Sequence, residues 1–230
     1  MNYELIKDLS ELTSFIEWLP ELQVGECYYV GLFARSKYCK SIVHISSDRA
    51  QMSRFVANKK NLLLKIKQLE CPVGAYQQRD VIVPQEALAL YITPNPRSQF
   101  SATKKLIHRA AELYTTPLGW DISQEVMSLI QTSSSRKIYI DVDIDDIDLN
   151  TVQDVLINND ILNLNAITYL QTRGGVHLLI KVSDIAKNYE KSWYQDLHKH
   201  FKIDLFGDKM MPIPGTYQGG FVPKLIYPIS

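Results

Sequence analysis

The chain has 230 residues, of which 46% are apolar and 22% charged, and its formal net charge is zero. This composition is typical of a globular protein, and no run of about 18 apolar residues predicts a membrane span. Zero net charge excludes nonspecific nucleic-acid binding by a uniformly basic surface, and three widely spaced cysteines exclude a disulfide framework. We therefore expect a cytoplasmic protein, or one of the host cytoplasm if a phage or plasmid encodes it.

The charges are nevertheless segregated along the sequence. From Arg35 to Lys67, nine residues are Lys or Arg and one, Asp48, is acidic. From Ile138 to Thr172, seven residues are Asp and none is Lys or Arg. Two solvated faces of opposite sign would explain this pattern, and so would a protein that binds polyanions and metal ions at separate places.

The first part of the chain predicts an α/β unit. We expect helices over 9–22, from Asp48 to about 69, from Ser98 or Ser101 to about 114, and over 121–131, and strands over 27–33, 41–45, 79–83 and 87–92. Prolines make residues 93–98 a rigid loop. The polar residues 132–135 are the best internal boundary. The prediction is thus an N-terminal α/β unit with a basic region (1–132) and a second unit (133–230), both within one compact domain.

The second part of the chain predicts a different order of elements. We expect strands over 137–143, 166–171 and 176–182, helices over 150–159 (capped by Asn150 or Thr151) and 184–201, and a final strand within 211–226. This is βαββαβ, the split-βαβ order of ferredoxin-like and RRM-like folds. The expected fold class is α+β, with this unit packed against the N-terminal one. In such a sheet the first and third strands are neighbours, and the fourth flanks the first.

An acidic pair on the first of these strands is the main candidate for chemistry. Successive side chains on a strand point to opposite faces, so Asp141 and Asp143 share one face while Ile140 and Val142 take the other. Like charges held this close repel each other, and divalent cations such as Mg²⁺ or Mn²⁺ remove that cost. A metal site of this kind suits nucleotidyl transfer.

A histidine at the start of the third strand is a candidate phosphate ligand. His177 follows Arg173, Gly174 and Gly175, where backbone N–H groups, an imidazole and a guanidinium can all donate to phosphate oxygens. Taken alone, a histidine on a strand is more often structural. An acidic pair on the neighbouring strand favours a role in the site.

A third metal carboxylate is predicted ahead of the fourth strand. Asp204 precedes a tight turn that contains Gly207 and Asp208, so either acid is a candidate. We favour Asp204, because Asp is common in turns for purely local reasons and Asp208 lies in one.

These motifs together resemble those of the archaeo-eukaryotic primase superfamily. Asp141-Val142-Asp143 resembles its acidic strand motif, Gly175-Val176-His177 its small-residue-x-His motif, and Ile203-Asp204 its hydrophobic-Asp motif. Residues 203–208, followed by 214–216, are similar to the primase-polymerase branch of phages and plasmids. The resemblance covers about residues 137–226. It departs where the second motif often opens with Ser, because Gly175 stands there.

The resemblance implies a DNA primase-polymerase that uses two divalent metal ions. It implies that Asp141, Asp143 and Asp204 hold Mg²⁺ or Mn²⁺, and that His177 acts on the phosphates of an NTP or dNTP. The remaining predicted nucleotide-binding residues are Arg173, Gly175, Lys224 and Arg97. The basic region from Arg35 to Lys67 would contact a single-stranded DNA template. Because the chain has no P-loop motif, unwinding would come from a replicative helicase on another chain.

Two other functions fit the same residues. A nucleotide cyclase or nuclease would keep the metal site and change the reaction. A non-catalytic module that binds nucleic acid or a helicase would need neither metal nor substrate, and the complete acidic and histidine set disfavours it.

Overall fold

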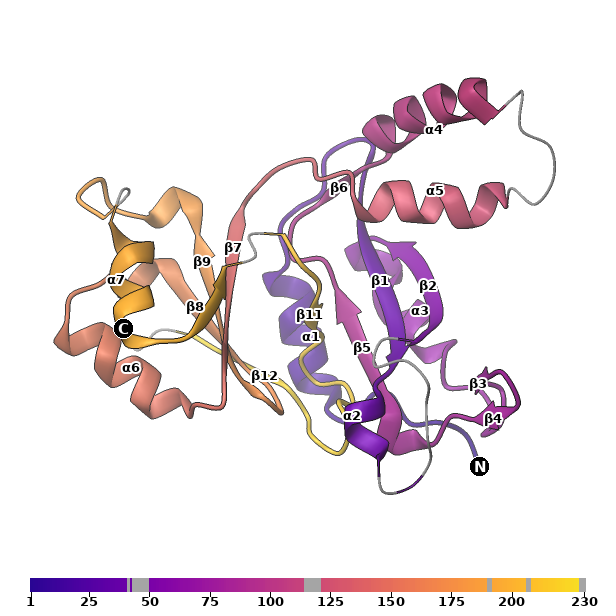
Figure 1. Ribbon diagram of the computed structural model, residues 1–230, viewed down its shortest axis with the longest axis horizontal. Helices are drawn as coiled ribbons and strands as arrows, with labels where there is room; N and C mark the ends of the chain where they lie inside the picture. Colours follow the sequence, from indigo (N-terminus) through magenta and orange to yellow (C-terminus); the bar gives the residue numbers. More distant parts are fainter. Residues whose placement is uncertain (41, 43–49, 114–120, 190–191, 206–207, 228–230) are drawn as a thin grey trace.

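The structure, a computed structural model, describes residues 1–40, 42, 50–113, 121–189, 192–205 and 208–227. Its architecture is mixed α+β, with helices packed against antiparallel sheets, which confirms the expected class. Figure 1 shows the two large sheets beside each other, the N-terminal one at the right and the C-terminal one at the left. A pair of helices, α4 and α5, projects from one end of the N-terminal sheet.

The N-terminal part is built on a five-stranded sheet. Its strands follow the order β11-β5-β1-β2, and β6 pairs with the beginning of β1. The elements of this part are α1 (Leu9–Trp18), β1 (Glu26–Ala34), α2 (Ser36–Cys39), β2 (Ala50–Ala57), α3 (Lys59–Lys67), β3 (Gln77–Gln78), β4 (Val81–Ile82), η1 (Gln85–Ala87), β5 (Leu88–Ile92), β6 (Arg97–Ser98), α4 (Gln99–Leu113) and α5 (Ile122–Gln131). Strand β11 (Met211–Pro212) reaches this sheet from the far end of the chain.

Strand β1 is buried on both faces, which explains its almost continuous apolar sequence. On one face, Tyr28, Val30 and Leu32 pack in a core that also contains residues of α1 and α3. On the other face, Cys27 and Tyr29 pack with residues of α4 and α5. The same strand therefore anchors both the main core and the projecting helices.

The region after β1 differs from the prediction. The predicted strand over 41–45, except for residue 42, and the predicted N-cap Asp48 lie outside the described residues. The helix predicted from Asp48 to about Leu69 is wrong in its first part, because residues 50–57 form β2, which pairs antiparallel with β1. Helix α3 begins only at Lys59, where Asn58 and Asn61 form a capping box. Pairing with β1 outweighs the local pattern here.

The C-terminal part is built on a second five-stranded sheet, with the order β10-β7-β9-β8-β12 and antiparallel pairing throughout. Its elements are β7 (Tyr139–Asp145), α6 (Leu149–Asn158), η2 (Leu164–Ala166), β8 (Ile167–Gln171), β9 (Gly175–Lys181), η3 (Val182–Asp184), α7 (Trp193–His200), β10 (Ile203–Leu205) and β12 (Lys224–Ile226). Residues of α6 and α7 form a core with one face of this sheet.

The two faces of this sheet have different neighbours. Val142, Ile144 and Leu178 belong to the core that α6 and α7 cover. On the opposite face, Tyr139 and Leu179 join the core of the N-terminal sheet. That face is therefore closed by apolar packing at the beginning of β7, and the acidic residues farther along β7 lie where it opens into a cleft.

The strand that pairs with the outer edge of β7 comes from a different segment than the sequence predicted. We expected the last strand of this sheet within residues 211–226, but β10 is the strand that pairs with the free edge of β7. Of the predicted segment, β11 pairs with β5 of the other sheet, and β12 pairs with β8. A strand of three residues is too short to show an alternating pattern, so its tertiary pairing alone identifies it.

Several element ends also differ from the prediction. Helix α1 stops at Trp18 instead of continuing to residue 22, because Pro20 disfavours helical geometry in the residue before it. The strand predicted over 79–83 is a two-stranded ribbon that turns at Arg79, whose φ is 54°. Helix α6 is capped by Asp148, and α7 begins at Trp193 instead of near Asp184. Within the described part of the chain, no helix combines the length and the apolar character needed to cross a membrane.

Candidate functional site

A cleft of about 760 Å³ lies between the two sheets and contains the predicted acidic pair. Asp141 and Asp143 both line it, as does Asp145, which is the next residue of the same alternation. Asp141 is only 3% exposed, whereas the side chain of Asp143 is 39% exposed. The carboxylate of Asp141 is therefore buried in the cleft wall, whereas those of Asp143 and Asp145 are more exposed to solvent.

His177 lies directly opposite Asp143 in the pairing of β9 with β7. Its Nδ1 is 2.8 Å from Oδ1 of Asp141, and its Nε2 is 3.3 Å from Oδ1 of Asp143. His177 as a whole is 7% exposed. Both nitrogens of a buried imidazole therefore face carboxylates of the predicted metal site.

These contacts determine the protonation of the histidine. Burial by itself lowers the pKa of His177, but the charge and hydrogen bond of Asp141, together with the charge of Asp143, outweigh it and raise this pKa to about 9. Burial raises the pKa of Asp143, against the opposing charge of His177. In this arrangement the imidazole is a cation at neutral pH and offsets the repulsion between the two carboxylates.

Asp204 occupies the neighbouring place on the other side of Asp143. It pairs with Asp143 across β10 and β7, just as His177 does across β9 and β7. Three residues from three separate sequence motifs therefore form one row across the sheet. The side chain of Asp204 lies outside the described part of the structure.

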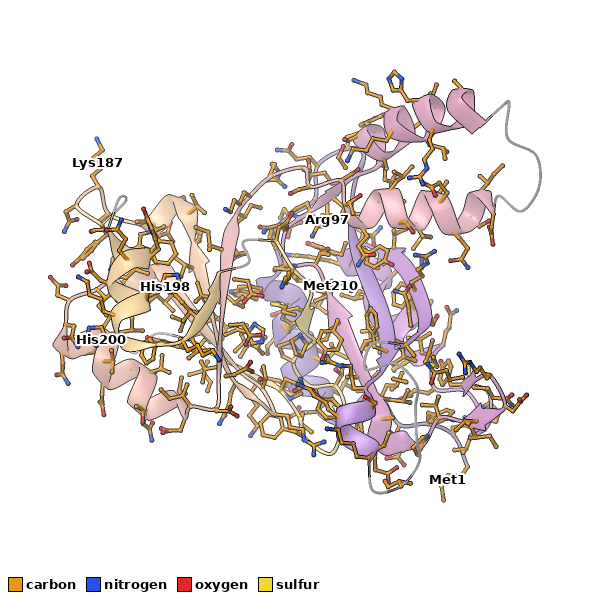
Figure 2. The ribbon with its side chains drawn as sticks, viewed as in Figure 1. Met1, Arg97, Lys187, His198, His200 and Met210 are labelled. Atoms are coloured by element: carbon orange, nitrogen blue, oxygen red, sulfur yellow. The ribbon has the colours of Figure 1, made fainter. Side chains whose placement is uncertain are left out.

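Asp208, the alternative third carboxylate, forms an ion pair with Arg97. One oxygen of its carboxylate is 2.6 Å from Nη1 of Arg97, and the other accepts a hydrogen bond from Asn95. Nη2 of Arg97 donates to the backbone carbonyl of Asp208. The side chain of Arg97 is 3% exposed, and in Figure 2 this residue lies in the region between the two sheets. Arg97 and Asp208 line the cleft, but each already satisfies the charge of the other.

The remaining predicted nucleotide-binding residues are not among those that line this cleft: Arg173, Gly175 and Lys224. The guanidinium of Arg173 donates to the carbonyl of Gly219 and lies 4.5 Å from the ring centroid of Tyr38. Gly175 packs against β7, where a Cβ would come within 2.1 Å of the carbonyl oxygen of Ile144. Lys224 is exposed on β12. Arg173 and Lys224 do not line the cleft with the carboxylates Asp141, Asp143 and Asp145 of β7, which we call the acidic row. Gly175 pairs with the last of these, Asp145, but through its backbone only.

Sequence reasoning missed the wall of the cleft opposite the acidic row. Arg35, Lys37 and Tyr38, at the end of β1 and in α2, line this wall together with Tyr91 of β5. The sequence assigned the basic region to a DNA template, and no local signal shows that its first residues face the carboxylates. Asp145, by contrast, could have been predicted from the sequence, because it follows Asp143 by two residues and therefore lies on the same face of the strand.

Other residues of the basic region have structural contacts. Arg54 donates to Ser128 and to the carbonyl of Gln124, both on α5, and thereby holds this helix against β2. Lys59 forms an ion pair with Glu21. Figure 2 places His198 and His200 on α7, at the outer side of the C-terminal sheet and away from the cleft.

The acidic row offers oxygen donors, the type of ligand that a hard divalent cation prefers. Carboxylate oxygens are the ligands that Mg²⁺ and Mn²⁺ prefer, and Asp141, Asp143 and Asp145 present them on one strand. Among the side chains that the structure describes, no three His, Cys, Asp or Glu residues are arranged closely enough to hold a metal ion. That finding does not extend to the side chain of Asp204, so the sequence-based metal set remains a prediction.

Comparison with known proteins adds no relative to this picture. No protein-family model, curated protein or solved structure matches the chain. The functional argument therefore depends on the geometry of the cleft and on its residues.

Proposed function

We propose that the chain is a DNA primase-polymerase that transfers nucleotides from an NTP or dNTP to a growing strand. The observation that carries this proposal is the row of His177, Asp143 and Asp204 across three adjacent strands, with Asp141 beside it on β7. These residues come from three motifs that lie far apart in the sequence. Their convergence on adjacent positions of one sheet is what a shared chemical role requires and what independent structural roles do not.

The strand order supports the finer fold assignment. In the order β10-β7-β9-β8, the fourth strand of the βαββαβ run flanks the first, and the third lies between the first and the second. This order is the one expected of a split-βαβ sheet, in which two βαβ units interleave. We therefore assign the C-terminal part to the ferredoxin-like or RRM-like class, with β12 as an additional edge strand.

The proposed roles follow from the position of each group. Asp141 and Asp143, with Asp204 as the predicted third ligand, would hold divalent ions, which when bound supply Lewis acidity at the reacting oxygens. Asp141 orients His177 through the 2.8 Å contact at Nδ1. A cationic His177 is suited to bind phosphate oxygens through Nε2 when a nucleotide replaces its contact with Asp143.

The proposal includes partners that the resemblance implies. The substrates are an NTP or dNTP and a single-stranded DNA template, and a replicative helicase on another chain would open the duplex. The proposed compartment is the cytoplasm, or the host cytoplasm for a phage or plasmid protein.

A metal-dependent nuclease or nucleotide cyclase is the second candidate. One contact favours a nuclease, because a histidine that a buried carboxylate keeps protonated can act as a general acid towards the leaving oxygen. The two reactions differ in their products, since a nuclease shortens a labelled strand and a cyclase acts on free nucleotide alone. A module without activity would give neither product.

The deciding experiment is primer extension with labelled NTPs and dNTPs, with and without a single-stranded template, in Mg²⁺ and in Mn²⁺. We expect template-dependent extension that Asp141→Ala and Asp143→Ala each abolish, while His177→Ala lowers catalytic efficiency by about 100-fold. Cooperative unfolding of the variants is the control for folding. Extension by the double Asp141→Ala and Asp143→Ala variant at the wild-type rate would refute the proposal.

A further inference from the structure

The cleft has a cationic wall, at the end of β1 and in α2, that faces the acidic row. Arg35, Lys37 and Tyr38, which we call the basic segment, line the cleft together with Asp141 and Asp143. The volume of about 760 Å³ is within the range of roughly 300–1,000 Å³ that small-molecule ligands occupy. A ligand in this space would contact carboxylates on one side and cations on the other.

Arg35 is fixed in place before any ligand binds. Its Nη1 donates to the hydroxyl of Tyr91 at 2.5 Å, and its guanidinium carbon lies 5.7 Å and 5.6 Å from the ring centroids of Tyr38 and Tyr91. The residue is 9% exposed. A guanidinium held between two rings loses little further freedom on binding an anion, so its contact with a phosphate is stronger than that of a mobile side chain.

Lys37 is exposed and lies within electrostatic range of the acidic row. Its ammonium group is 5.4 Å from the ring centroid of Tyr38. Burial raises the pKa of Asp143, and the positive charge of Lys37 opposes that rise. An anion between Lys37 and Asp143 would therefore be adjacent to the predicted metal ligands. This is the place that a nucleotide's phosphates must take if the carboxylates act on them.

The cations predicted from the sequence are less suited to this role. Both terminal nitrogens of Arg97 are bound to Asp208. Arg173 does not line the cleft, and its guanidinium is directed at the carbonyl of Gly219 and at the ring of Tyr38. Lys224 is not in the lining either.

We propose that the basic segment binds the polyphosphate of the nucleotide substrate through Arg35 and Lys37, with Tyr38 as the residue that positions them. This inference rests on the proposed function, since it names the protein groups that hold the substrate of that reaction. Tyr38 also accepts a hydrogen bond from Gln218 and stacks under Arg173, so it joins the basic segment to the turn before β9. Arg173 thereby supports the site through Tyr38 and does not touch phosphate.

The test measures the affinity of the full chain for adenosine, AMP, ADP and ATP by calorimetry with Mg²⁺. We expect Lys37→Gln to weaken ATP binding by about 10-fold, the scale of one charge-assisted hydrogen bond, and to leave adenosine unchanged. The matched control is Lys40→Gln, which removes the same charge from an exposed position outside the lining. Arg35→Gln should have a larger effect, and Arg173→Gln should affect ATP no more than adenosine.

The outcomes separate this inference from the function on which it rests. Because Lys37 is exposed, its variant reports on binding even if Arg35→Gln does not fold. If the wild type binds ATP and extends primers while Lys37→Gln behaves like Lys40→Gln, the basic segment is not the phosphate site and the proposed function stands. If Arg173→Gln alone loses the preference for ATP over adenosine, the sequence-based assignment is right and this one is wrong. If the wild type binds no nucleotide and extends no primer, the proposed function fails and this inference fails with it.

Discussion

The ion pair of Arg97 with Asp208 allows the roles of two neighbouring carboxylates to be separated. Asp208 ties the segment after β10 to strand β6, because its carboxylate and its carbonyl both accept from Arg97. Asp208→Asn keeps the size and one acceptor oxygen but removes the negative charge. A guanidinium that is 3% exposed then loses its counter-charge.

The size of the effect follows from burial. Removing one partner of a fully buried pair costs about 3–5 kcal/mol, and an exposed pair contributes less than about 1 kcal/mol. The side chain of Asp208 is 32% exposed, and Arg97 retains its 3.0 Å bond to the carbonyl of residue 208. We therefore expect Asp208→Asn to lower the free energy of unfolding by about 2 kcal/mol. For a chain of this length that corresponds to a fall in Tm of roughly 4–8 °C.

Thermal and urea unfolding, followed by circular dichroism, measure this loss. Asp184→Asn is the matched control, since Asp184 pairs with Lys181 on the surface and the same substitution there should cost less than about 0.5 kcal/mol. The double variant Arg97→Met with Asp208→Asn should cost less than the sum of the single variants, because no buried charge is left without a partner. Equal costs for Asp208→Asn and Asp184→Asn would refute the argument.

A comparison of Asp208→Asn with Asp204→Asn tests which residue is the third metal carboxylate. Well below its Tm, Asp208→Asn should retain most of its primer-extension activity, because its charge serves Arg97. Asp204→Asn should lose activity, since Asp204 stands next to Asp143 in the row across the sheet. An active Asp204→Asn variant beside an inactive Asp208→Asn variant, both measured at saturating Mn²⁺, would reverse the assignment.

Two further predictions concern the stability of the fold. Gly175→Ala should lower the free energy of unfolding by about 1–3 kcal/mol, because the added Cβ would lie 2.1 Å from the carbonyl oxygen of Ile144. Gly174→Ala is the control and should cost less, since its Cβ would lie 3.4 Å from the nearest atom. Urea unfolding measures both costs. Hydrogen bonding and charge from Arg136 hold the pKa of Glu26 at about 2, below its ordinary value, so this pair should contribute stability above about pH 4.5 that is lost as the pH falls towards 2. Since the side chain of Arg136 is 35% exposed, we expect the pair to contribute about 2 kcal/mol at pH 7. Roughly half of this is lost by pH 3, so Glu26→Gln should reduce the difference in unfolding free energy between pH 7 and pH 3 by about 1 kcal/mol, as measured by urea unfolding. An unchanged difference would contradict this reasoning.

Local pattern was sufficient for the acidic strand and its immediate neighbourhood. Alternation placed Asp141 and Asp143 on one face of β7, because a strand has a period of two whatever surrounds it. The same rule would have identified Asp145. The α+β class followed from the order of helical and strand patterns, which depends on short-range periodicity.

Pairing across the sheet was decided by tertiary structure. Strand β10 has three residues and β11 two, too few for a periodic signal, and their partners β7 and β5 lie far away in the sequence. Segment 50–57 became β2 because the edge of β1 satisfies its backbone hydrogen bonds.

The sequence also could not show which charged residues contact one another. Sequence counted the cations of the basic region but could not tell that Arg35 and Lys37 face the carboxylates while Arg54 holds α5. Nor could it tell that Arg97 would be neutralised by Asp208. The sequence by itself determined which groups are available and which strand face they share. Only the tertiary structure decided which charges meet, because an ion pair depends on distance in space and not on separation along the chain.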